Sequence, residues 1–142
     1  MLRALELAEE AAAQGEVPVG AVVVRKGEII GEGRNRREAD RSALAHAELL
    51  AIQSACRALE DWRLSDCALY VTLEPCPMCT GAILNAHLPI IVYGVDDERA
   101  GCCGTAADLF TLPGAKRPLV YRGFFEAECK KLLQDFFQSI RT

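Results

Sequence analysis

Residues that could bind and use a metal ion lie in two short stretches of the chain. Residues 45–48 read AHAE, and residues 75–79, about thirty positions later, read PCPMC. Cysteine and histidine are preferred zinc ligands, and zinc takes four protein ligands in structural sites but three plus water in catalytic ones. We therefore predict an open catalytic site in which His46, Cys76 and Cys79 hold zinc, water is the fourth ligand, and Glu48 moves protons beside it.

The spacing within each stretch sets how helices must present these side chains. If a helix opens at Cys76, then Cys76 and Cys79 lie at i and i+3 on one face and can share one metal. His46 and Glu48 lie at i and i+2, so they reach one site only if it caps a helix end. We expect that helix to begin near residue 42 or 43. Two helix N-termini would then converge on the metal, and their dipoles would favour thiolates.

Further donors leave a second interpretation of the fourth zinc position open. His87 is the only other histidine, and Cys102 and Cys103 are adjacent thiols. A thiolate in the fourth position would close the site and make it structural, with no place for a nucleophile. We favour the open site and expect a surface or capping role for His87.

Length and composition bound the class of protein. The chain has 142 residues, 51% of them hydrophobic and 25% charged, so we expect residues 1–142 to form a single domain. It has no apolar run of about eighteen residues and no signal-peptide pattern, so we expect a cytoplasmic protein without a membrane partner. The seven cysteines are then expected to be metal ligands and buried thiols, not disulfides.

The net charge of −4 argues against a protein that coats nucleic acid nonspecifically, but it leaves room for a small RNA-binding surface. Two cationic clusters could build one: Arg34, Arg36, Arg37 and Arg41 before the predicted metal histidine, and Lys116, Arg117 and Arg122 later. Acidic residues are interspersed in the first cluster, so a solvated loop is an equal alternative.

Hydrophobic periodicity predicts an α/β fold, with a mixed sheet and helices on both faces. Helices are expected over residues 2–14, 43–59, 76–86 and 126–140, and the last helix is expected to bury its aromatic stripe. Strands are expected over residues 21–24, 28–33, 67–73, 89–93 and 119–121, the first two forming a hairpin. The long loop over residues 94–118 is of the kind that is usually functional or mobile.

The two metal-binding stretches and several further segments resemble a known enzyme family. His-Ala-Glu followed by Pro-Cys-x-x-Cys is similar to the signature of zinc-dependent nucleobase deaminases. A closer resemblance, to the bacterial tRNA-specific adenosine deaminases, covers nearly the whole chain: residues 16–22 (EVPVGAV), 35–36 (NR), 62–64 (WRL), 70–76 (YVTLEPC) and 135–137 (DFF). The chain departs from that family at residues 43–44, which are AL in place of PT, and at residues 116–117, which are KR in place of NH.

The resemblance implies a three-layer α/β/α, cytidine-deaminase-like fold with a five-stranded sheet. It implies hydrolytic conversion of adenosine to inosine at the wobble position of a tRNA anticodon stem-loop, with one Zn²⁺ per subunit and Glu48 as the catalytic residue. Substrate contacts are implied for Asn35, Val17, Pro18 and Ala47. A homodimer is the expected assembly.

Two other functions remain open from the residues alone. A deaminase of free bases or nucleosides, such as guanine, cytosine or cytidine, would share the motif and need no basic surface. A structural zinc module that binds a partner would do no chemistry, but it would have no use for the Glu48 carboxylate beside its metal.

Overall fold

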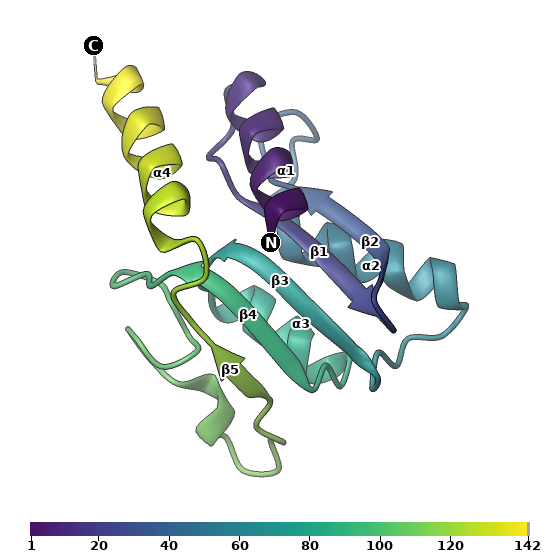
Figure 1. Ribbon diagram of the computed structural model, residues 1–142. Helices are drawn as coiled ribbons and strands as arrows, with labels where there is room; N and C mark the ends of the chain where they lie inside the picture. Colours follow the sequence, from purple (N-terminus) through teal and green to yellow (C-terminus); the bar gives the residue numbers. More distant parts are fainter. Residues whose placement is uncertain (142) are drawn as a thin grey trace.

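The computed structural model describes residues 1–141, which build one mixed five-stranded sheet with helices on both faces (Figure 1). The helices are α1 (Leu2–Ala13), α2 (Ala47–Leu59), α3 (Pro77–Asn85) and α4 (Glu126–Ile140), with a 3₁₀ turn η1 at Leu109–Thr111. The strands are β1 (Gly20–Arg25), β2 (Glu28–Arg34), β3 (Cys67–Leu73), β4 (Ile90–Val95) and β5 (Leu119–Tyr121). The predicted α/β fold and its five-stranded mixed sheet are confirmed.

The order of the strands puts the metal-binding stretch at the middle of the sheet. The order is β2-β1-β3-β4-β5. β1 pairs antiparallel with β2 and β3, whereas β3, β4 and β5 run parallel. Parallel neighbours need a crossover connection, and α3 supplies it between β3 and β4. Because β3 is the central strand, the chain leaves the sheet centre directly into residues 75–79.

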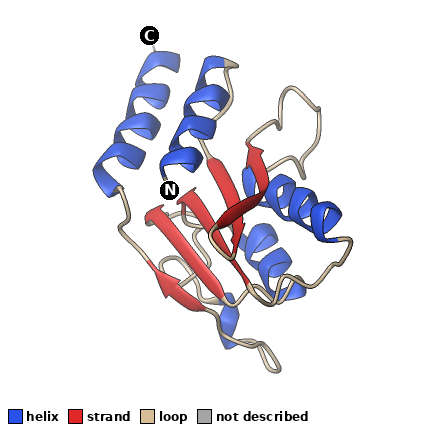
Figure 2. Ribbon diagram, turned by 45° about the vertical axis from the view of Figure 1, so that its right-hand side comes forward, coloured by secondary structure: helices blue, strands red, loops and turns tan. Residues whose placement is uncertain are grey.

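The helices form two pairs on opposite faces of the sheet. α2 contacts α3 on one face, and α1 contacts α4 on the other (Figure 2). The buried core between α2, α3 and the sheet includes Leu69, Val71, Ile83, Ile91 and Tyr93, none of which is measurably exposed. This packing gives α2 and α3 a rigid platform.

A glycine in β2 determines how closely the start of α2 approaches the sheet. A Cβ atom on Gly33 would collide with the backbone carbonyl of Ala47, the first residue of α2. Only glycine allows this approach, because it has no Cβ. The close contact holds the N-terminus of α2, and with it His46, beside the sheet.

The second helix begins later than its sequence predicts. α2 starts at Ala47 with His46 as the N-cap, and not near residue 42 or 43. Residues 36–45 form a turn, in which the Arg36 N–H donates to the Ala45 carbonyl at 2.9 Å. The hydroxyl of Ser42 accepts from the Leu44 N–H at 3.2 Å and so caps this turn instead of a helix.

α4 has the predicted bounds, but the prediction that its apolar stripe belongs to the core is wrong. Cys129 is its one fully buried residue, whereas Phe137 is 41% and Ile140 63% exposed. The reason is position: α4 contacts only α1 and β4 among the helices and strands of residues 1–141 with more than marginal contact. No helix in this part of the chain has both the length and the apolar character needed to cross a membrane.

Candidate active site

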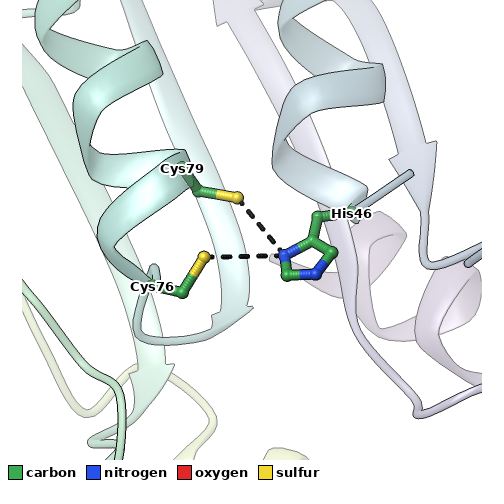
Figure 3. A group of neighbouring side chains, drawn as sticks. All are labelled: His46, Cys76 and Cys79. Atoms are coloured by element: carbon green, nitrogen blue, oxygen red, sulfur yellow. Dashed lines mark hydrogen bonds between the residues drawn. The ribbon is translucent and has the colours of Figure 1, made fainter. Parts of the chain in front are cut away.

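The three predicted metal ligands meet at one point. His46 is the N-cap of α2 and Cys76 the N-cap of α3, while Cys79 lies in the first turn of α3. The Nδ1 atom of His46 lies 3.6 Å from the Sγ atom of each cysteine (Figure 3). Tetrahedral zinc with its usual Zn–S and Zn–N bond lengths places sulfur and nitrogen ligands ~3.6 Å apart. The spacing therefore fits a zinc ion bound by these three residues.

The prediction that two helix N-termini converge is confirmed by this arrangement. The first turns of α2 and α3 face each other, and their free backbone N–H groups and dipoles favour negative charge on the ligands (Figure 3). Hydrogen bonds from the Cys79 thiol and from His46 lower the pKa of the Cys76 thiol to about 4. The pKa of Cys79 is raised, chiefly because it is the hydrogen-bond donor in that pair.

Glu48 lies beside the metal ligands but is not one of the three. It is the second residue of α2 and is only 4% exposed. Burial raises the pKa of its carboxyl group to about 7. A carboxyl group held next to an open metal site can accept a proton and return it.

A cavity of about 190 Å³ opens onto this centre. It is smaller than the ~300–1,000 Å³ typical of pockets for drug-sized ligands, so its scale suits a single base better than a whole nucleotide. It is lined by Val17, Val19, Asn35, Arg37, His46, Ala47, Glu48, Leu73, Glu74, Cys76, Asp97 and Ala100. A larger cavity of about 700 Å³ lies at the far end of α3, around His87 and Lys116, and it holds none of the three metal-ligand residues.

Three of the four predicted substrate contacts line the cavity, namely Val17, Asn35 and Ala47. Pro18 is fully buried and is not among the lining residues. The Asn35 amide donates to the Val17 carbonyl at 3.3 Å and accepts from the Arg37 N–H at 3.2 Å. One further amide hydrogen of Asn35 is available to a ligand, and the substrate roles of all four residues stay predictions.

Several lining residues were not among the predicted site residues, although the first three lie in segments that carry the family resemblance: Val19, Leu73, Glu74, Asp97 and Ala100. Val19 and Leu73 lie beside or within apolar strands, and Glu74 directly precedes the cysteine motif. Residues in such positions are ordinarily expected to pack in the core. Asp97 and Ala100 belong to the long loop after β4. The length of that loop was the available signal, because long loops in compact domains are often functional.

The other donors considered for the metal lie outside the site. His87 follows α3 and stacks edge-on with Trp62, with ring centroids 5.4 Å apart. Cys103 is buried with its Sγ atom 3.8 Å from the Thr80 hydroxyl, and burial raises its pKa to about 12. Neither these residues nor Cys102 belongs to the His-Cys-Cys group, which has three members among residues 1–141.

Some cations of the two basic clusters are paired with carboxylates and others are not. Arg34 pairs with Glu10 at 3.1 Å, Arg36 with Asp40 at 3.0 Å, and Arg117 with Asp108 at 2.6 Å; Arg122 lies 3.9 Å from Asp96. Within residues 1–141, Arg37, Arg41 and Lys116 have no carboxylate partner. Arg37 is the only one of these cations at the cavity.

The fold and the site together define a deaminase of the cytidine-deaminase-like class. The MafB19-like deaminase family matches residues 1–141. The tRNA-specific adenosine deaminase of Bacillus subtilis is 44% identical over 142 residues, which cover 99% of this chain and 88% of that protein. The chain belongs to the family of tRNA-specific adenosine deaminases.

Solved structures agree with this assignment. A structure from a study of A-to-I editing by tRNA:A34 deaminases at the wobble position of transfer RNA is 40% identical, with a TM-score of 0.88, and the match covers 92% of this chain and 95% of that one. A guanine deaminase from Bacillus subtilis is 34% identical, with a TM-score of 0.66 and coverage of 99% and 90%. The nearer of the two is therefore the tRNA deaminase.

Proposed function

We propose that the chain is a single zinc-dependent deaminase domain that hydrolyses adenosine to inosine at the wobble position of a tRNA anticodon loop. The observation that carries the proposal is the open His-Cys-Cys centre, with the Glu48 carboxyl group beside it in a base-sized cavity. The relatives described above support adenosine in tRNA as the substrate.

The residues present fit one zinc ion per subunit. His46, Cys76 and Cys79 would hold it, which leaves the fourth position to water. When bound there, zinc supplies Lewis acidity that makes water a good nucleophile near neutral pH. Two thiolates and one neutral imidazole offset its charge.

Glu48 moves the protons of the reaction. It takes a proton from the attacking water and passes it to the ring nitrogen next to C6, and then helps the departing amine to leave as ammonia. The net reaction consumes one water and converts the C6 amine to a carbonyl. Val17 and Ala47 hold the base face, and Asn35 offers its free amide hydrogen to the base edge.

An anticodon loop suits this cavity because the base must leave its stack to enter it. A single-stranded loop base needs little free energy to leave its stack, and the rest of the nucleotide would stay outside the cavity. Arg37 at the cavity has no carboxylate partner among residues 1–141 and is available to a substrate phosphate. The same centre would also serve a free base, and the likeness to a guanine deaminase makes guanine the second candidate.

The experiment that separates these candidates measures ammonia and inosine release by the zinc-loaded protein. The substrates are an anticodon stem-loop with adenosine at the wobble position, the same stem-loop with guanosine there, and free guanine, cytidine and adenosine. We expect turnover of the first substrate alone. Turnover of free guanine without turnover of the stem-loop would move the protein to the second candidate.

We also propose a homodimer and a cytoplasmic location, the latter because tRNA is the substrate. Support for self-association comes from the edge strand β5 and the segments next to it, which expose large apolar side chains: Leu112, Leu119, Tyr121, Phe124 and Phe125. Sedimentation velocity at micromolar concentration tests the assembly. A single species with the mass of one chain would contradict the dimer.

A further inference from the structure

Two buried glutamates have no role in the chemistry described above. Glu16 is 3% and Glu74 2% exposed. Neither forms an ion pair within residues 1–141, although Arg36 lies near enough to Glu16 for electrostatic attraction, and burying a carboxylate without an ion pair is costly. Both instead accept hydrogen bonds from backbone N–H groups, which offset that cost.

Glu74 holds the loop that follows β4. Its Oε1 atom accepts from the Asp97 N–H at 3.0 Å, and its Oε2 atom accepts from the N–H groups of Cys103 and Thr105 at 2.9 and 3.2 Å. The loop closes tightly on the carboxyl group, since a Cβ atom on Gly101 would lie 2.5 Å from it.

This loop is one wall of the cavity. Asp97 and Ala100 line the cavity directly, and the Asp97 carboxylate accepts from the Ala100 N–H at 3.2 Å. Glu74 itself lies between the end of β3 and the metal-binding stretch. It therefore ties this wall to the segment that carries Cys76.

Glu16 does the same for a second wall. Its Oε1 atom accepts from the Glu38 N–H at 3.0 Å and its Oε2 atom from the Ala39 N–H at 2.8 Å. The turn over residues 36–45 contains these two residues, follows Asn35 and leads into His46, and Asn35 and Arg37 line the cavity. Glu16 also directly precedes Val17, another lining residue.

We propose that Glu16 and Glu74 are positioning residues, each of which holds one wall of the cavity in the conformation that receives the base; this inference rests on the proposed function. A carboxylate suits the task because both of its oxygens accept N–H groups, whereas only one of the two terminal atoms of an amide does and the other is a donor. The walls contact substrate in both the ground state and the transition state. Loosening them therefore weakens binding more than it slows chemistry.

The test uses two isosteric variants, Glu74→Gln and Glu16→Gln, in the full zinc-loaded chain. In each, one carboxylate oxygen becomes an NH₂ group that faces a backbone donor. Amide hydrogen exchange should speed up at Asp97, Cys103 and Thr105 in Glu74→Gln, but at Glu38 and Ala39 in Glu16→Gln. We expect the KM for the stem-loop to rise roughly tenfold with kcat within about threefold, and zinc content to stay at the wild-type value.

A third variant, Thr72→Val, separates positioning from general destabilisation. The buried Thr72 hydroxyl in β3 accepts from the Gly20 N–H at 3.2 Å, so its loss removes a side-chain hydrogen bond between β3 and β1 and not one that holds a wall. It should lower the melting temperature without changing the KM. An unchanged KM in both glutamine variants, exchange that speeds up uniformly over the chain, or loss of zinc from Glu74→Gln would overturn the proposal.

The exchange experiment needs no activity, so it is independent of the proposed function. If the wild-type protein did not deaminate the stem-loop, the proposed function would fail. The pattern of exchange would still decide whether each glutamate holds its own wall, and the KM would then be measured on whichever substrate is turned over.

Discussion

At the end of the sheet where α2 and α3 begin, charged side chains are buried, whereas along β5 and α4 apolar side chains are exposed. Glu16, Glu48 and Glu74 are each less than 5% exposed, while Leu119 is 60% and Ile140 63% exposed. Both regions invert the usual distribution of polar and apolar residues in a folded protein. Each inversion costs free energy. In the first region the cost is the loss of water around buried carboxylates, and in the second it is the exposure of apolar surface to water.

In the first region the cost is offset inside the chain. Backbone N–H groups satisfy the carboxylates of Glu16 and Glu74, and the metal ligands face one another across two helix N-termini. In the second region, the described part of this chain leaves the apolar groups uncovered. The buried groups of the first region are therefore largely satisfied within the chain, whereas the second region is the part of the molecule from which contact with another molecule is expected.

Loss of a metal ligand should have the largest effect, because the first region depends on the charge of the ion. Cys79→Ser should reduce zinc content from one per chain to near zero, and with it deamination to background. Cys103→Ser, which changes a buried thiol outside the ligand group, is the matched control and should retain zinc. Zinc content is measured by mass spectrometry of the purified protein, and a Cys79→Ser protein with full zinc would show that the ligand set is wrong.

Glu48→Gln should come next, because it removes the proton carrier and leaves the ligands in place. We expect zinc content to be unchanged and kcat to fall about 10²–10⁴-fold. The measurement is single-turnover inosine formation, with the exposed Glu28→Gln as control. Turnover close to that of the wild type would remove Glu48 from the mechanism.

Arg37→Ala should have a smaller effect, confined to binding. Loss of one phosphate contact should weaken stem-loop affinity about threefold to tenfold and reduce the slope of log K against log salt by roughly 0.7–1. The control is Arg36→Ala, because the Arg36 guanidinium is already paired with Asp40. Equal losses in both variants would mean that neither arginine meets the substrate specifically.

The smallest effect is expected in the second region. Phe137→Ala should lower the free energy of unfolding by less than about 1 kcal/mol, because its side chain is exposed. Leu69→Ala in the core should cost about 2–5 kcal/mol. Urea denaturation measures both, and a loss above about 2 kcal/mol for Phe137→Ala would show that another molecule covers α4 in solution.

The sequence predicts a feature of the fold or the site well when the contacts that determine that feature join residues close together in the chain. Cys76 and Cys79 are three residues apart, so a helix start alone places them together. The alternating and helical patterns predict the five strands and the four α-helices, though not the 3₁₀ turn η1 in the long loop, because local periodicity reflects which face is buried. The start of α2 is missed because Ser42 caps a turn whose conformation depends on contacts with Glu16, more than twenty residues earlier.

The sequence by itself determined the donor set of the metal centre, the carboxylate beside it and the α/β class of the fold, since each depends on residue type and short spacing. Only the tertiary structure decided that Glu16 and Glu74 hold the cavity walls, that Arg37 reaches the cavity while Arg36 is paired, and that α4 leaves Phe137 exposed. These facts depend on which segments pack together across the sheet. Local propensity carries no information about that packing.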